Sequence, residues 1–148
     1  MKGLLREWKK FLSEQASYQG ILKTSLPPQI VSDLEAAQSF LPEEAIRLSP
    51  DDFHLTLIHQ SVLNPFKERL KEIDLPEPPD PHVDDEVFMR KSPGKKSWAV
   101  RIINQDDFKN YVAQVMGLLG SENTNPEPER VFHISLANLT GNPYDSVR

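Results

Sequence analysis

The sequence predicts an α+β domain made of two similar halves, on the strength of three observations. Segments with the periodicity of strands and of helices follow one another in the order strand, helix, strand, helix, connector, two strands, helix, strand. The 148 residues are 38% hydrophobic and 26% charged, which is typical of a globular domain with its own core. A five-residue pattern occurs once in each half. We therefore expect residues 1–148 to form a single domain.

The amino-terminal segment, residues 1–15, is expected to form an amphipathic helix that begins at residue 2. Its apolar residues fall on one face at helical spacing: Leu4, Leu5, Trp8, Phe11 and Leu12. We expect this face to pack on the domain, and a partner protein or a membrane surface is the alternative use of the same stripe. A protein partner, if the chain has one, is expected to bind here.

Two strands and two helices are expected in the rest of the first half. Residues 18–26 predict a strand. Pro27 and Pro28 then suit the first turn of a helix that ends before Pro42. Alternation over residues 53–59 predicts a second strand, and residues 64–73 predict a short helix.

A proline-rich stretch separates the halves. Residues 75–81 cannot form a helix or a central strand, and we expect them to connect the two lobes of the domain. Residues 86–91 and 97–104 predict a hairpin, because Ser-Pro-Gly-Lys at 92–95 has the composition of a turn.

One helix and one strand complete the second half. Asp106 or Asp107 is expected to cap the helix, and Gly120 is expected to end it. A loop over residues 123–129 then leads to a last strand over residues 131–136.

Composition excludes several classes of function. The chain has no cysteine, which rules out disulfides, cysteine-ligated zinc, thiol nucleophiles and iron–sulfur clusters. No apolar run approaches the length of a membrane span, and none is expected. A net charge of −5 argues against wrapping of duplex DNA but leaves a local phosphate pocket open. Without a secretory hydrophobic region at its start, the protein is expected to be cytoplasmic.

The repeated pattern is the strongest signal in the sequence. Phe-His-Leu-Thr-Leu occupies residues 53–57 and Phe-His-Ile-Ser-Leu occupies residues 132–136, each inside an expected strand. Because side chains alternate across a strand, the histidine and the hydroxyl residue of each copy share one face, about 7 Å apart. Two such copies favour a shared function over two structural histidines.

The residues on these two faces suit phosphoryl chemistry. Imidazole gives and takes protons near neutral pH, so one of His54 and His133 can remove a proton from the attacking oxygen while the other protonates the leaving oxygen. The hydroxyls of Thr56 and Ser135 can donate hydrogen bonds to the non-bridging phosphate oxygens. This scheme uses no metal and no cofactor.

The paired motifs, 79 residues apart in a small acidic chain, resemble those of the two-histidine (2H) phosphoesterase superfamily, which includes LigT-like 2′-5′ RNA ligases and 2′,3′-cyclic phosphodiesterases. The resemblance implies a bilobal, pseudo-symmetric fold with antiparallel sheets lining a central cleft and helices outside. It implies that His54 and His133 are the acid/base pair and that Thr56 and Ser135 hold the phosphate. The implied substrate is a nucleotide or RNA-end phosphodiester: a 2′,3′-cyclic phosphate, a 2′-5′ linkage or a small cyclic oligonucleotide.

Other residues are candidates for substrate contact. Tyr18, Trp98 and Tyr144 can stack on a base or pack within the fold, and Arg148 can hold a phosphate. A basic cluster near the hairpin turn is interpreted either as a phosphate contact or as a solvated turn: Arg90, Lys91, Lys95 and Lys96.

The two remaining histidines are expected to have no catalytic role. His59 lies five residues after His54, which predicts the opposite strand face and a structural role, and His82 is expected to be solvated. The spacing of the four histidines does not suit a zinc site. The alternative to an enzyme is a non-catalytic module that binds nucleotides or RNA ends on the same fold.

Overall fold

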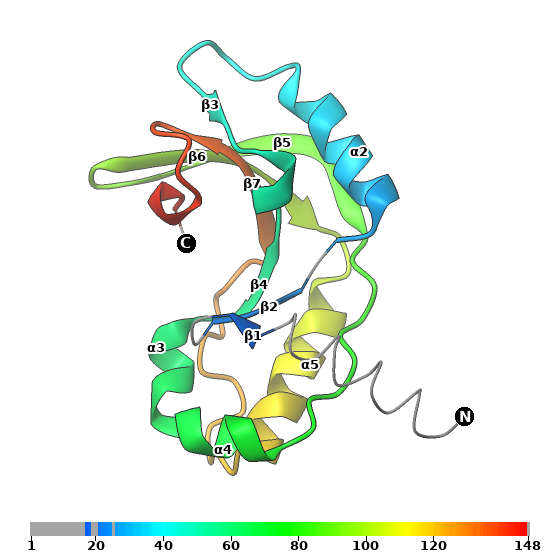
Figure 1. Cartoon of the computed structure of the whole chain (residues 1–148), viewed down its shortest axis with the longest axis vertical. Coiled ribbons are helices and arrows are strands. Elements are labelled where there is room, and N and C mark those ends of the chain that lie inside the picture. Colours follow the sequence, from blue (N-terminus) through cyan, green and yellow to red (C-terminus); the bar gives the residue numbers. More distant parts are fainter. Residues whose placement is uncertain (1–16, 19–20, 25, 148) are drawn as a thin grey trace. The chain divides into compact units, whose positions relative to one another are not determined.

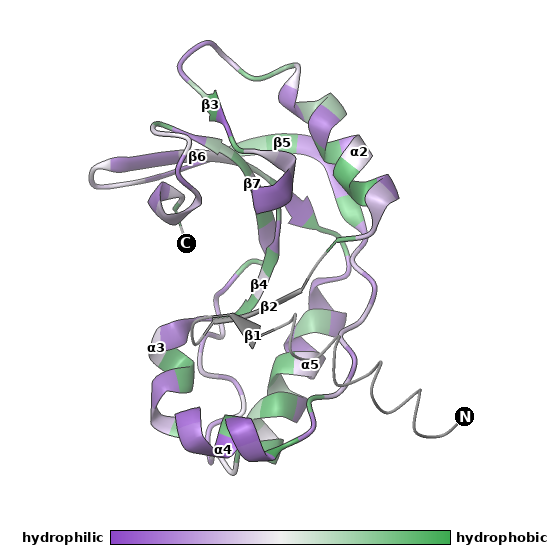
Figure 2. Ribbon diagram, viewed as in Figure 1, coloured by the Kyte–Doolittle hydropathy of each residue, from purple (hydrophilic) through white to green (hydrophobic). Residues whose placement is uncertain are grey.

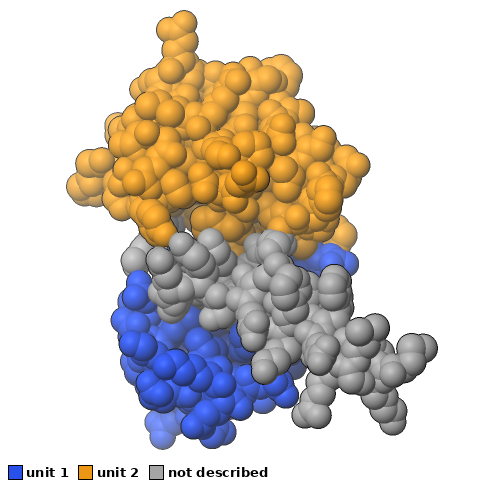
Figure 3. All heavy atoms as spheres, in the orientation of Figure 1, with its two compact units in different colours: residues 1–24, 56–80, 104–130 blue, residues 25–55, 81–103, 131–148 orange. Residues whose placement is uncertain are grey.

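The computed structural model describes residues 17–18, 21–24 and 26–147 and has an α+β architecture with antiparallel strand pairing (Figure 1). The helix expected over residues 2–15 lies outside the described residues. The chain divides into two compact units (Figure 3). Unit 1 consists of residues 1–24, 56–80 and 104–130, and unit 2 of residues 25–55, 81–103 and 131–148. No helix in the described part of the chain is both long enough and apolar enough to cross a membrane.

Unit 2 contains a four-stranded antiparallel sheet in the order β3-β7-β6-β5. Its strands are β3 (Ile46–Arg47), β5 (Val83–Ser92), β6 (Lys95–Ile102) and β7 (His133–Asn138). The predicted hairpin is confirmed, because Ser92 pairs with Lys95 and Gly94 in the turn has a φ of +75°. Glycine adopts a positive φ without a steric penalty, so Pro93 and Gly94 can close the hairpin in two residues.

Helix α2 (Pro28–Gln38) contacts β5 and β7 of this sheet. It begins where the two prolines predict, with Pro27 at the N-cap position and Pro28 as its first residue. Proline is tolerated there because the first amides of a helix have no partner within the helix. Leu34 is buried, and α2 carries hydrophobic and hydrophilic residues on different faces (Figure 2).

A buried amide joins α2 to the edge of the sheet. Gln38 is 5% exposed, and its Nε2 donates to Leu48 O at 2.9 Å and to Leu136 O at 2.8 Å. Leu48 N also donates to Leu136 O at 2.9 Å, which extends the pairing of β3 with β7 by one residue. The side chain therefore satisfies backbone acceptors that would otherwise lose a donor in the interior.

Replacing Gln38 with leucine is expected to destabilise the protein by about 1–3 kcal/mol, because Leu48 O loses the Gln38 donor and Leu136 O keeps only Leu48 N, while the volume stays similar. The matched control is Gln29→Leu, since Gln29 lies on the same helix, is exposed, and donates from Nε2 to the exposed Asp33 at 3.2 Å. This control should change stability by less than about 0.5 kcal/mol. Urea denaturation measures both, and equal midpoints for the two variants would contradict the role of Gln38.

A hydrogen-bonded turn follows β7. The buried Asn138 accepts from Thr140 N at 3.0 Å and Gly141 N at 2.6 Å, and its Nδ2 donates to Asn142 O at 2.6 Å. Gly141 has a φ of +80°, which only glycine adopts readily. The short 3₁₀ helix η3 (Pro143–Asp145) follows, so the last described residues are held by one amide of the sheet.

Unit 1 contains a three-stranded sheet in the order β1-β2-β4, formed by β1 (Ser17–Tyr18), β2 (Ile21–Thr24) and β4 (Leu55–Ile58). The first residue of β4, Leu55, belongs to unit 2. The prediction of one strand over residues 18–26 was wrong: β1 and β2 pair antiparallel, with Tyr18 opposite Ile21. Strand propensity does not reveal where a chain reverses direction.

The helix expected over residues 64–73 begins earlier and is interrupted. Helix α3 (Gln60–Leu63) is followed by the 3₁₀ turn η2 (Asn64–Phe66) and then by α4 (Lys67–Glu72). Pro65 lacks an amide hydrogen, so it cannot continue the i to i−4 bonding of α3.

Helix α5 (Gln105–Leu118) supplies four buried residues of unit 1: Phe108, Tyr111, Val115 and Met116. Asn104 holds the N-cap position instead of the predicted Asp106 or Asp107, and its amide donates to Asp107 at 3.0 Å. The two carboxylates lie in the first turn, where they suit the positive end of the helix dipole. Gly120 has a φ of +80° just after the helix, as predicted.

The proline-rich stretch, residues 75–81, has no helix or strand, as predicted. The Tyr111 hydroxyl donates to Pro76 O at 2.9 Å and so ties the stretch to α5. Burial raises the pKa of Tyr111, which keeps its hydroxyl protonated as a donor. One passage of the chain from unit 1 to unit 2 falls at the end of this stretch, between residues 80 and 81.

Candidate functional site

The two motif copies have the same pattern of burial. In each copy the three apolar residues are buried, whereas the histidine and the hydroxyl residue are half-buried. The buried residues are Phe53, Leu55 and Leu57 in the first copy and Phe132, Ile134 and Leu136 in the second. This agrees with the predicted alternation, in which the apolar side chains enter the core and the polar pair faces away from it.

The two imidazoles are also held in the same way. The Nδ1 atom of His54 lies 2.9 Å from Asp52 O, and the Nδ1 atom of His133 lies 3.0 Å from Val131 O. In both copies the acceptor is the carbonyl two residues earlier in the chain. Because a carbonyl only accepts, a neutral ring in this bond carries its hydrogen on Nδ1 and its lone pair on Nε2. The repeat therefore extends from sequence to hydrogen bonding.

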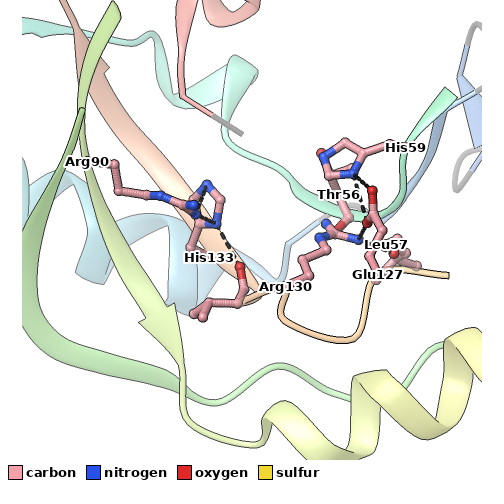
Figure 4. Close-up of polar contacts among 8 residues, drawn as sticks. Thr56, Leu57, His59, Arg90, Glu127, Arg130 and His133 are labelled. Carbon is pink, nitrogen blue, oxygen red and sulfur yellow. Dashed lines mark hydrogen bonds and ion pairs between the residues drawn. The ribbon is translucent and has the colours of Figure 1, made fainter. Parts of the chain in front are cut away.

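Arg90 on β5 contacts His133 directly (Figure 4). Its Nη1 lies 2.9 Å from Nδ1 and 3.5 Å from Nε2 of the imidazole. A guanidinium only donates, so it approaches a nitrogen that carries a lone pair, and its charge opposes a second positive charge on the ring. The contacts of Nδ1 with Val131 O and with Arg90 need different tautomers of a neutral ring: Nδ1 donates to the carbonyl when it carries the hydrogen, and it accepts from Arg90 when it carries the lone pair.

A second arginine lies on the same face of the sheet. Arg101 on β6 is the register partner of His133 on β7, and its Cζ lies 4.4 Å from the centre of the Phe88 ring. The Phe88 ring in turn meets the His133 ring edge-on, with centroids 6.3 Å apart. Partial burial, and next the charge of Arg101, lowers the pKa of Arg90. This face therefore concentrates positive charge around one imidazole.

Ser135 belongs to the same surface, two residues beyond His133 on β7. Ser135 pairs in register with Ala99 on β6, and Ala99 pairs with Phe88 on β5, the strand on the other side of β6. Cross-strand partners in an antiparallel sheet have side chains on one face, so the Ser135 hydroxyl shares a face with the Phe88 ring. We call this surface the arginine face: Phe88, Arg90, Arg101, His133 and Ser135.

In unit 1, a different arginine holds the strand that carries Thr56. Arg130 donates through Nη2 to Thr56 O and through Nη1 to Leu57 O, the latter at 2.5 Å (Figure 4). Glu127 accepts from His59 Nδ1 at 2.8 Å and lies 3.6 Å from Arg130 Nη1. His59 therefore has a carboxylate partner, in keeping with the structural role predicted for it.

Two of the functional contacts were not found from the sequence. Arg90 was named only as one of four basic residues near the hairpin turn, and Arg130 was not singled out. Each acts on a residue far along the chain, 43 residues away for Arg90 and 73 or 74 for Arg130. The sequence offers one signal for Arg130, which is its position three residues before His133, the first residue of the strand that carries the second motif.

The predicted substrate contacts fall into three groups. Trp98 is 5% exposed, so its ring packs in the fold, whereas Tyr144 is 61% exposed. Tyr18 lies on β1, and Arg148 lies outside the described residues. Of the other basic residues near the turn, Lys96 is paired with Glu44 at 2.6 Å and Lys95 Nζ lies 3.5 Å from Tyr144 O.

The described residues contain no group of three or more histidine, aspartate or glutamate side chains that could hold a metal ion. Comparisons of the chain with protein-family models, with curated proteins and with solved structures find no match. The functional argument therefore rests on the chemistry of the motif residues and their neighbours.

Proposed function

We propose that the protein is a 2H-type phosphodiesterase that hydrolyses a nucleotide phosphodiester, with His54 and His133 as its acid/base pair. The observation that carries this proposal is the doubled arrangement of an imidazole whose Nδ1 bonds to the carbonyl two residues earlier. A half-buried hydroxyl residue follows two positions later in each copy. Repetition of the tautomer-setting bond is unexpected for two unrelated structural histidines.

The course of the chain in unit 2 supports a shared site for the two histidines, which both belong to that unit. Ile46 pairs with Asn138 and Arg47 pairs with Ala137, so β3 and β7 run in opposite directions. The chain leaving Leu48 thus runs toward the His133 end of β7, and His54 follows six residues later. The two motif strands lie in different sheets, β4 and β7, as two lobes of a bilobal 2H fold require.

We infer different roles for the two imidazoles from the charge beside His133. In the proposed reaction, neutral His133 takes a proton from water through the ring nitrogen that carries its lone pair, because the positive charge of Arg90 beside the ring opposes a second positive charge there. The water oxygen bonds to phosphorus and the bond from phosphorus to one ester oxygen breaks. His54, protonated at the start, donates its Nε2 proton to that leaving oxygen. The products are a phosphomonoester and an alcohol, and both histidines then exchange protons with solvent.

In the proposed reaction, charge that develops on the non-bridging oxygens is stabilised by hydrogen-bond donors. Within unit 2, the Ser135 hydroxyl donates to these oxygens and Arg90 adds a positive charge beside His133; the resemblance gives Thr56, the hydroxyl residue of the first motif copy, the same role. Each positioned acid or base contributes about 10²–10⁴-fold to the rate, so the pair can account for much of the catalysis without a metal ion.

The proposal is tested by a hydrolysis panel in the presence of EDTA. The substrates are 2′,3′-cyclic mononucleotides, 2′-5′ oligoadenylate, cyclic dinucleotides and short RNA ending in a 2′,3′-cyclic phosphate. We expect turnover of at least one class at a rate that EDTA changes by less than about 2-fold, since the proton transfers are made by side chains. Loss of activity in EDTA would contradict the mechanism. Binding without turnover of any substrate would instead support a non-catalytic module.

A further inference from the structure

The arginine face holds more positive charge than hydrolysis of one diester requires. Arg90 and Arg101 both lie beside His133: Arg90 contacts the imidazole at 2.9 Å, and Arg101 is its partner in register. Arg101 lies on the Phe88 ring at 4.4 Å, and this cation–π contact holds the guanidinium in place before any ligand binds. Two fixed cations therefore share one surface of unit 2.

These two cations lack carboxylate partners among the described residues. Within residues 17–18, 21–24 and 26–147, the ion pairs closer than 4.0 Å involve His59, Lys71, Lys96 and Arg130, and none involves Arg90 or Arg101. The neighbouring Lys96 shows the contrast, since Glu44 lies 2.6 Å from its Nζ. Two uncompensated positive charges repel each other, and an anion bound between or beside them relieves that repulsion.

The charge balance points to a ligand with more than one phosphate. A phosphodiester carries one negative charge, which Arg90 beside His133 balances when the scissile phosphate is bound. Arg101 is then left with no ion pair closer than 4.0 Å to a carboxylate of the described residues, and the scissile phosphate is already balanced by Arg90. Its planar, pre-oriented guanidinium suits a second phosphate, which it can bind through two parallel hydrogen bonds.

We propose that Arg101, held on Phe88, forms a subsite for a second phosphate of the substrate. The inference rests on the proposed function for the place of the first phosphate. It narrows the substrate class to nucleotides with a phosphate group next to the scissile diester, such as oligonucleotides or end-phosphorylated dinucleotides. A 2′,3′-cyclic mononucleotide, with a single phosphate, would leave the subsite empty.

The test measures binding, so that it does not depend on turnover. Calorimetry on the His54→Ala protein gives dissociation constants for three dinucleotides of thymidine: unphosphorylated, 5′-phosphorylated and 3′-phosphorylated. One end phosphate is expected to tighten binding by about 10-fold or more, equivalent to one charge-assisted hydrogen-bonded pair. In His54→Ala/Arg101→Gln this gain should fall to about 2-fold or less.

The matched control is Lys109→Gln in the same background, which removes one positive charge from an exposed position on α5 and should keep the full gain. A second measurement does not need the Arg101 variant. The gain in affinity from the end phosphate should shrink as the ionic strength rises, because salt screens the attraction between the phosphate and the guanidinium. The inference is overturned by equal affinity for all three dinucleotides, by undetectable binding of all of them, or by an undiminished gain in the Arg101 variant. A wild-type protein that binds with the expected gain but hydrolyses nothing would refute the proposed function alone.

Discussion

Alanine at either His54 or His133 is expected to lower the rate of phosphodiester hydrolysis by about 10²–10⁴-fold, the usual contribution of one positioned acid or base. Both rings are half-buried, and each is anchored through Nδ1 to a backbone carbonyl, so the other nitrogen is the one that exchanges protons with substrate. Loss of one ring removes one proton transfer and leaves the phosphate-binding groups in place. We therefore expect kcat to fall much more than KM changes.

The pH dependence of kcat/KM distinguishes catalysis from a structural role. One neutral and one protonated imidazole give a bell-shaped profile in the wild-type protein. If His133 is the base, His133→Ala should lose the acidic limb, where the rate rises as the base loses its proton. His54→Ala should lose the alkaline limb, where the rate falls as the acid loses its proton. A merely structural histidine would lower the whole profile without removing a limb.

His82 provides the matched control for both substitutions. Its side chain is exposed and lies outside the motifs, and its carbonyl accepts from Ile103 N, a bond that alanine keeps. His82→Ala should retain activity within about 2-fold, as expected for an exposed site away from the chemistry. Circular dichroism and thermal unfolding establish that each variant is folded. Full activity in folded His54→Ala or His133→Ala would refute the acid/base assignment.

Local features of the fold could be predicted because their causes are local. Pro27 and Pro28 start α2, and Pro93 with Gly94 closes the hairpin, since each residue restricts or extends the backbone angles at its own position. The alternation of buried and half-buried residues in both motifs also follows from strand geometry alone.

Features that depend on distant segments could not be predicted. The chain reversal between β1 and β2 is set by pairing, which strand propensity over residues 18–26 does not encode. Gln38 looked like a polar residue near a helix end, yet it is buried because two carbonyls from segments 10 and 98 residues away need its donors. The cationic neighbours of His133 likewise come from β5 and β6, and only the sheet register brings them together.

The motif sequence alone also left the acid and the base unassigned, because the two copies are nearly identical. What differs is the surroundings. Arg90 stands 2.9 Å from the His133 ring, and this contact breaks the symmetry of the pair by favouring one neutral imidazole. The same sheet face supplies Arg101 and thus a reason to expect a second phosphate. The surroundings that distinguish the two motif copies therefore come from neighbouring strands, which the motif sequence alone does not reveal.

The second large effect is expected at Arg130, where methionine should destabilise the protein by about 2–5 kcal/mol. Its side chain is 11% exposed and donates to the carbonyls of Thr56 and Leu57 on β4. Methionine keeps much of the aliphatic packing but removes the charged donors, each worth about 1.5–3 kcal/mol to a buried acceptor. It also removes a cation from Glu127, which then has His59 as its ion-pair partner at 2.8 Å.

Two comparisons separate this specific clamp from a general loss of charge. Lys71→Met removes a cation from an exposed pair with Glu68 at 3.7 Å and should change stability by less than about 1 kcal/mol. Arg130→Lys keeps the charge near Glu127 but cannot donate to both carbonyls at once, so we expect an intermediate loss. Amide exchange should quicken first in β4, the strand that the guanidinium holds. A stability of Arg130→Met equal to that of Lys71→Met would show that Arg130 does not hold the strand that carries Thr56.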